Sequence, residues 1–319
     1  MPKQHLSLLE YAPDLLTEKT AKRLTKSAGF SSLRIAPEDI AASDLVVASA
    51  EPLLRETHGD DIGAIVFVSK TQDYIEPATS HLLQDRLRLS NKVLCLDINE
   101  GCSGWVKGLY TSALLSRQMN KSVLLADGDT TSRLTSPKDR ATRCIFGDAG
   151  TVTLIAPNQP ETSRMSFEFE SLGESHDAII TQGLKGRKTE ELKNDGFMYM
   201  DGIAVLNFSL NDVPELIQSF LAELDLTVDE VSLFACHQAG KKILNSLADK
   251  LGVSYERLPF VAGEIGNVSS ASIPLMLTLC ADKARLDRVL CCGFGVGLSI
   301  GVGMIDFSDT KFYGVMEVE

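Results

Sequence analysis

Three residues combine a polar or reactive side chain with a position just before a predicted helix, and two of them also end an apolar strand, where sites collect in α/β proteins. The first is Cys102, in the segment DINEGCSGW, between a predicted strand over Val93–Ile98 and a predicted helix over Ser103–Gln118. The positive end of a helix dipole favours the thiolate, which is the nucleophilic form of cysteine. The position indicates a nucleophile, although an isolated cysteine is more often a small buried apolar residue.

The second and third residues are His237 and Asn267. His237 lies in LFACHQAGKK, after an apolar strand and before a helix over Lys241–Leu251. Asn267 lies in GEIGNVSSASIPL, before a helix over Ser270–Cys280. An amide can donate to an oxygen on which charge develops, and it does not titrate. Taken singly, the histidine fits a hydrogen-bonded loop residue better, and the asparagine fits a helix cap or a turn residue better.

Short apolar runs alternate with amphipathic stretches along the whole chain, which predicts α/β layers. Two further helices are expected over Ser80–Leu89 and Leu210–Leu226. The other expected strands are Ala64–Ser69, Ser122–Ala126, Thr151–Ala156, Val231–Ala235, Leu258–Ala262, Arg288–Cys292 and Leu298–Ile305.

The two halves of the chain echo each other. The segment FGDAG precedes the last strand of the first half, and GFGVG precedes the last strand of the second. We therefore expect two similar βαβ-rich halves, residues 1–165 and 166–319, divided within the polar segment 157–195 and packed as an α-β-α-β-α body.

The composition narrows the class of protein. A net charge of -12 argues against nucleic acid or an anionic membrane as a partner of the whole surface. Seven cysteines, an odd number without a CxxC pair, indicate a reducing compartment.

The N-terminus lacks the pattern of a secretory leader. The uncharged stretch 289–305 contains five glycines, which favours two buried strands over a membrane span. We expect a cytoplasmic protein.

In this order, CSG, HQA and GNVSSAS resemble the Cys-His-Asn signatures of β-ketoacyl-acyl-carrier-protein synthase III, a condensing enzyme of the thiolase superfamily. The segments FGDAG, MDGIAVLNF and GFGVGLSIG are also similar to the family, and the likeness extends from about Tyr11 to Ile305. Papain-like proteases share the order of the three residues. They fit less well, because here the cysteine follows strand-rich sequence and the two halves echo each other.

The resemblance implies a thiolase fold and an acyltransferase that makes a carbon–carbon bond by Claisen condensation. Cys102 would carry the acyl group, taken from a coenzyme A or acyl-carrier thioester. Backbone amides of Cys102 and of Val296, which follows Gly295 in the glycine-rich turn, would form one oxyanion hole. His237 and Asn267 would stabilise the enolate of a malonyl thioester as it loses CO₂. The resemblance also implies a homodimer, and it calls for no metal or cofactor.

Four features depart from the family or refine the expectation. Val296 takes the middle place of a turn that is often all glycine, and the tryptophan that stacks on coenzyme A is absent. Glu76, in QDYIEPATS, occupies the loop that in the family enters the partner's acyl tunnel. It is either a base for condensing two acyl thioesters without decarboxylation or a solvated loop residue. The pair Lys241-Lys242 is either a docking site for an acidic acyl carrier or a solvated helix face.

Three functions therefore remain open. The first is decarboxylative condensation in fatty-acid, lipid or secondary-metabolite synthesis. The second is non-decarboxylative condensation, or acyl transfer to a small acceptor, on the same fold. The third is a catalytically silent partner subunit, which the presence of all three polar residues disfavours.

Overall fold

The computed structural model describes residues 1–57, 61–157, 165–182 and 192–319. The first of its two large sheets has the strand order β4-β3-β5-β6. Strands β3 (Ile62–Val68), β4 (Leu94–Ile98) and β5 (Ser122–Asp129) run parallel, and β6 (Ala149–Ile155) pairs antiparallel with β5. Every residue of β3 is buried, as expected of a strand covered on both faces.

The second sheet has the order β10-β11-β12-β7. Strands β10 (Leu233–Cys236) and β11 (Val289–Gly295) are parallel. Strand β12 (Ser299–Ile305) is antiparallel to β11, and β7 (Ser166–Ser171) is antiparallel to β12. The parallel strands β3, β4, β10 and β11 are followed at their carboxyl ends by Lys70, Cys102, His237 and the glycine-rich turn at Gly297.

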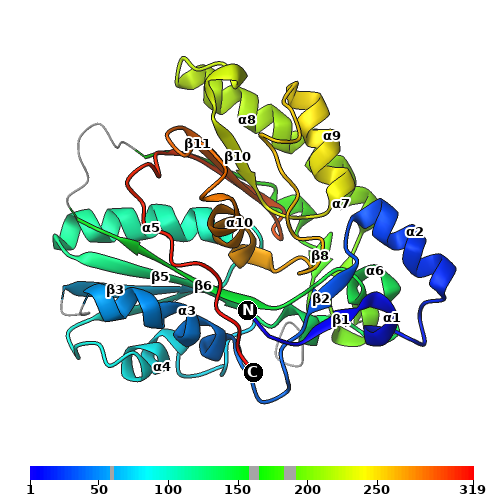
Figure 1. The fold of residues 1–319 in the computed structure, drawn as a ribbon, viewed down its shortest axis with the longest axis horizontal. Coiled ribbons are helices and arrows are strands. Elements are labelled where there is room, and N and C mark those ends of the chain that lie inside the picture. The colour runs from blue at the N-terminus through cyan, green and yellow to red at the C-terminus, as the bar shows by residue number, and fades with distance from the viewer. Residues whose placement is uncertain (58–60, 158–164, 183–191) are drawn as a thin grey trace.

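Two helices, α5 (Gly104–Met119) and α10 (Ser272–Cys280), pack between the sheets (Figure 1). The outer face of the first sheet is covered by α3 (Ala42–Thr57) and α4 (Thr79–Arg86). On the far side lie α7 (Gly202–Leu210), α8 (Asp212–Glu223) and α9 (Lys241–Leu251). Helix α10 is buried on nearly every side, as a central helix must be. The expected α-β-α-β-α layering is confirmed.

The N-terminal segment and the C-terminal segment meet at one side of the body. Strand β1 (His5–Ser7) pairs with β2 (Ser32–Arg34), with α1 (Leu8–Tyr11) and α2 (Glu18–Ala28) between them. The last residues return along the surface, and Val318 pairs with Pro2 (Figure 1). The smaller elements are α6 (Arg140–Arg143), β8 (Ile179–Ile180) and β9 (Tyr199–Met200).

One predicted strand is wrong. Leu258–Ala262 forms no strand, because Pro259 has no amide hydrogen and the N–H of Val261 donates to the side chain of Gln238 at 2.8 Å. The uncharged stretch is indeed two strands, β11 and β12. Within the described ranges, no helix is long and apolar enough to span a membrane. The division at residues 165 and 166 stays a prediction, since 158–164 and 183–191 lie outside the described residues.

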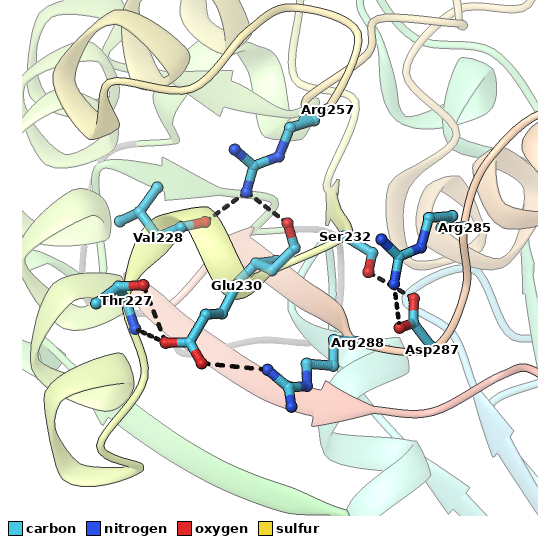
Figure 2. Close-up of polar contacts among 9 residues, drawn as sticks. Thr227, Val228, Glu230, Ser232, Arg257, Arg285, Asp287 and Arg288 are labelled. Atoms are coloured by element: carbon cyan, nitrogen blue, oxygen red, sulfur yellow. Dashed lines mark hydrogen bonds and ion pairs between the residues drawn. The ribbon is translucent and has the colours of Figure 1, made fainter.

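Charged side chains tie together the amino ends of β10 and β11 (Figure 2). Glu230 accepts hydrogen bonds from the N–H of Thr227 at 2.9 Å and from Arg288 at 3.3 Å. Asp287 accepts from the hydroxyl of Ser232 at 2.6 Å and from Arg285 at 2.7 Å. Each of the two carboxylates therefore has both a cationic and a neutral donor.

Candidate active site

Cys102 lies in the turn between β4 and α5, with only 6% of its surface exposed. Its Sγ is 4.0 Å from the Oγ of Ser269. Burial raises the pKa of the Cys102 thiol, while the positive charge of Lys70 and the hydroxyl of Ser269 oppose that rise. The sequence suggested that the start of helix α5 favours the thiolate. In the structure, burial of the thiol opposes that effect. The neighbouring side chains matter as well.

His237 follows the last residue of β10 and is almost fully buried. Its Nδ1 lies 2.7 Å from the Oγ of Ser272, and the ring of Phe294 meets the imidazole edge-on at 5.5 Å between centroids. Burial, with a smaller contribution from the charge of Lys70, lowers the pKa of His237 to about 3. The imidazole is therefore neutral at any pH near 7.

Asn267 stands in a loop fixed against the first half of the chain. Its N–H donates to the carbonyl of Ile145 at 2.9 Å, and its own carbonyl accepts from Gly147 at 3.0 Å. Position 147 must be glycine, because a Cβ there would lie 2.2 Å from the carbonyl oxygen of Ile265. This close approach explains why an FGD turn accompanies the asparagine segment.

The side chains of Asn267 and His237 meet. The Nδ2 of Asn267 is 3.3 Å from the Nε2 of His237. The Oδ1 of Asn267 accepts the N–H of Ser269 at 2.9 Å, which leaves Nδ2 as the end of the amide that faces the imidazole. Because Ser269 also lies beside Cys102, the three predicted residues gather in one buried site.

The glycine-rich turn after β11 lies directly against the cysteine turn. A Cβ at Gly295 would be 2.9 Å from the Cβ of Cys102, so the backbone approaches the nucleophile as closely as glycine permits. The side chain of Val296 lies against Gly101. Across the same junction, the hydroxyls of Ser103 and Ser299 are 2.9 Å apart.

Glu76, Lys241 and Lys242 do not lie in this buried site. Glu76 stands on an exposed loop beside Tyr74 and Ile75, which are 60% and 68% exposed. The two lysines are exposed at the start of α9. All three side chains thus face outward in a single chain.

Three further residues at this site, Lys70, Ser269 and Ser272, were not predicted from the sequence. Lys70 directly follows a predicted strand, so the rule that singled out His237 also applied to it. The serines stand in GNVSSAS, where they read as small residues opening a helix. Across the described part of the chain, no three His, Cys, Asp or Glu side chains are gathered in a way that could hold a metal ion.

Two family profiles match the chain. Residues 96–173, which include Cys102, match 3-oxoacyl-[acyl-carrier-protein (ACP)] synthase III. Residues 221–307, which include His237 and Asn267, match the C-terminal part of the same enzyme family.

Individual proteins agree with these matches. The chain is 30% identical over 283 residues to β-ketoacyl-[acyl-carrier-protein] synthase III 2 of Halalkalibacterium halodurans, covering 86% of this chain and 85% of the relative. It is 32% identical over 276 residues to β-ketoacyl-[acyl-carrier-protein] synthase III of Levilactobacillus brevis, covering 83% and 84%.

A solved structure shows the same architecture. The 3-oxoacyl-(acyl-carrier protein) synthase of Burkholderia xenovorans LB400 superimposes with a TM-score of 0.93 at 32% identity, covering 99% of this chain and 94% of that one. The thiolase fold expected from the sequence is thereby confirmed. The protein is an acyltransferase, and it belongs to the β-ketoacyl-acyl-carrier-protein synthase III family of condensing enzymes.

Proposed function

We propose that the chain condenses an acyl group held on Cys102 with a malonyl thioester, and that His237 and Asn267 stabilise the enolate. The observation that carries this proposal is the meeting of a neutral amide and a neutral imidazole beside a buried cysteine, with 3.3 Å between Nδ2 of Asn267 and Nε2 of His237. A neutral pair of this kind suits an oxygen whose negative charge appears only during the reaction.

Donation to an enolate requires the ring hydrogen of His237 on Nε2, and we assign it there. The N–H of Gln238 lies 3.5 Å from the Oγ of Ser272, which makes this hydroxyl an acceptor from the backbone. The hydroxyl hydrogen of Ser272 is then available to Nδ1 of His237, at 2.7 Å. With Nδ1 accepting, the imidazole carries its hydrogen on Nε2. Nδ2 of Asn267, which can only donate, lies 3.3 Å from Nε2, so the two hydrogens would turn away from each other and towards a shared substrate oxygen. Both donors then point to one place, where the enolate oxygen would lie.

The backbone amides of Cys102 and Val296 would form the oxyanion hole for acylation. The close contact between Gly295 and Cys102 brings the two turns together, which supports this pairing. Attack of the thiolate on the acyl thioester would form the bond from Sγ to the carbonyl carbon and break the bond to the carrier sulfur, which leaves as a thiol. Thioester exchange and loss of CO₂ need no metal or redox cofactor.

We infer that an acyl carrier protein or coenzyme A delivers the thioesters. Lys241 and Lys242 begin α9, and the end of α2 packs against this point: a Cβ at Gly29 would lie 2.5 Å from the Cβ of Lys241. Helix α2 adds four exposed basic residues, whose proximity to α9 was not predicted from the sequence: Lys19, Lys22, Arg23 and Lys26. On a chain of net charge -12, this is a local basic surface for an acidic partner.

We further infer a homodimer that forms across β4, the edge strand of the first sheet. Its side chains Leu94 and Leu96 are 44% and 37% exposed, and an exposed apolar edge is unfavourable in a monomer. Tyr110 and Leu114 add exposed apolar surface from α5. A symmetric dimer there would cover the patch. Light scattering that gives the mass of one chain would contradict this inference.

The place of action we infer is the cytoplasm. All seven cysteines are free, and five of them are buried, including Cys236, Cys291 and Cys292. Free thiols of this kind persist in reducing compartments.

The central test is mass spectrometry of the intact protein after incubation with a panel of acyl thioesters. We expect a single acyl adduct that maps to Cys102 and that is absent in Cys102→Ala. An adduct that persists in the alanine variant would overturn the assignment. Adding labelled malonyl thioester to the acyl-enzyme should then release CO₂ together with a β-ketoacyl product.

Glu76→Gln separates the decarboxylative reaction from the alternative in which this carboxylate is a base. If malonyl thioester is the extender, decarboxylation makes the carbanion, and the variant should release CO₂ at nearly the rate of the unchanged enzyme. A base contributes ~10²–10⁴ in rate. A loss of that size in condensing two acyl thioesters, with acylation of Cys102 unaffected, would instead favour the non-decarboxylative reaction.

A further inference from the structure

Lys70 is held rigidly at the carboxyl end of β3. Its N–H donates to the Oδ1 of Asp129 at 3.0 Å. The same oxygen accepts from the hydroxyls of Ser69 at 3.1 Å and Thr71 at 3.0 Å. Asp129 is fully buried at the end of β5. A buried carboxylate with three donors fixes the backbone from which the lysine side chain extends.

The Lys70 side chain extends towards the nucleophile. Its ammonium lies 5.4 Å from the ring centroid of Phe146, within the range of a cation–π contact. It donates to the Oγ of Ser269 at 2.9 Å, and this Oγ is 4.0 Å from the Sγ of Cys102. The ammonium of Lys70, the hydroxyl of Ser269 and the thiol of Cys102 therefore lie next to one another in space, in that order.

Ser269 occupies an unusual backbone conformation to take this place. Its φ is 55°, in the left-handed region that residues with a side chain rarely adopt. Its N–H donates to Oδ1 of Asn267 at 2.9 Å, so the same strained residue also orients the amide of Asn267. Strain retained beside a nucleophile is the kind that points to a functional role.

The direction of the hydrogen bonds follows from the chemistry of the groups. An ammonium only donates, so the Oγ of Ser269 must accept from Lys70. The hydroxyl hydrogen of Ser269 is then available to the sulfur of Cys102. A thiolate would receive this hydrogen bond and would have a positive charge behind it, whereas a neutral thiol gains little from either.

The other charged or titratable groups that face Cys102 do not provide this stabilisation. His237 comes from the end of β10, and it is neutral because its pKa is lowered to about 3. It is therefore not an imidazolium partner for a thiolate. Asp129 comes from the end of β5, and its negative charge opposes ionisation of the thiol. Lys70 is the group whose charge favours ionisation.

We propose that Lys70, acting through Ser269, is a positioning residue that stabilises the thiolate of Cys102 for acylation. The inference rests on the proposed role of Cys102 as nucleophile and adds two residues to that site. Ionisation releases the thiol proton to solvent. The thiolate then attacks the thioester carbonyl, and the departing carrier thiolate takes up a proton from solvent.

The experiment measures the rate at which iodoacetamide alkylates Cys102 between pH 6 and 11, with the adduct quantified by peptide mass spectrometry. The midpoint is the pH at which this rate reaches half of its plateau at high pH. Lys70→Met keeps the length of the side chain and removes the charge, while Lys70→Arg keeps the charge. We expect Lys70→Met to move the midpoint upward by about one pH unit and to slow alkylation near pH 7 by about tenfold. Lys70→Arg should restore most of the change, and Ser269→Ala should shift the midpoint in the same direction by less.

Lys283→Met is the matched control, since this exposed lysine lies near the amino ends of β10 and β11. It should leave the midpoint unchanged. The proposal fails if Lys70→Met has the midpoint of the unchanged protein, or if Lys70→Met and Lys70→Arg shift it equally, which would indicate packing rather than charge. The readout needs no acyl substrate, so the two proposals can fail separately. A shifted midpoint in a protein that never forms an acyl-enzyme would overturn the proposed function, while the effect of Lys70 on the thiolate of Cys102 would stand.

Discussion

The two ends of the strands β10 and β11 use polar residues in opposite ways. At the amino ends, Glu230 and Asp287 are charged, partly exposed and supplied with at least two donors each (Figure 2). At the carboxyl ends, His237 is buried and neutral. Hydrogen bonding lowers the pKa of Glu230 and of Asp287, whereas burial dominates at His237.

The difference separates stability from chemistry on the same pair of strands. A charged side chain that is already paired interacts only weakly with a substrate. Exposed ion pairs also contribute little to the free energy of folding. A buried neutral donor has been removed from water before any reactant arrives, so it interacts strongly with charge that develops during a reaction. The contrast therefore predicts that substitutions at the carboxyl ends affect rate and that substitutions at the amino ends affect neither rate nor stability by much.

The largest effect is expected for His237→Ala and Asn267→Ala. Losing one donor to a developing oxyanion typically lowers the rate by ~10²–10³. Each variant should still form the acyl-enzyme on Cys102, because acylation is assigned to the backbone amides. The measurement is release of labelled CO₂ from malonyl thioester beside the mass of the acylated protein. Equal losses in acylation and CO₂ release would mean that the two side chains act on both steps.

A smaller effect is expected from Asp127, a fully buried carboxyl in β5. Burial, and then the charge of Asp129, raise its pKa well above the usual 3.8. The folded protein therefore holds a proton on Asp127 that the unfolded chain releases above its normal pKa. Stability should fall as the pH rises from about 4 towards the folded pKa, by up to ~1.4 kcal/mol per pH unit.

Asp127→Asn should remove this dependence. We expect the melting temperature of the unchanged protein to fall between pH 5.5 and 8.5 by more than that of the variant. The pH dependence of stability due to Asp287 has the opposite sign. Because its pKa is lowered, its contribution to stability is present above the usual carboxyl pKa and is lost in acid. Parallel melting profiles for Asp127→Asn and the unchanged protein would contradict the assignment of a buried protonated carboxyl.

Predictions from the sequence were confirmed where the type of a residue and its position along the chain indicated the same structural element. Alternating apolar runs predicted both sheets and the central helices. Two strand-to-helix junctions pointed to Cys102 and His237, and the start of a helix pointed to Asn267. Strand β7 was missed, because its alternating SFEFES lies in a segment that was treated as a polar boundary. Lys70 and Ser269 were missed for another reason. Their role depends on a contact between residues 199 positions apart, and no local pattern marks such a contact.

The smallest effect is expected at the amino ends of β10 and β11. The side chains of Glu230 and Arg288 are 42% and 50% exposed. Glu230→Gln weakens the ion pair between them and keeps an oxygen that accepts the N–H of Thr227. Because water screens exposed pairs, we expect the melting temperature to change by less than about 2 °C and the rate of condensation to change by less than about twofold. Arg288→Met should behave alike, and added salt should reduce any difference. A loss of condensation comparable to that of His237→Ala would break the contrast between the two ends, because it would mean that the charged cluster acts on the active site through the length of the strands.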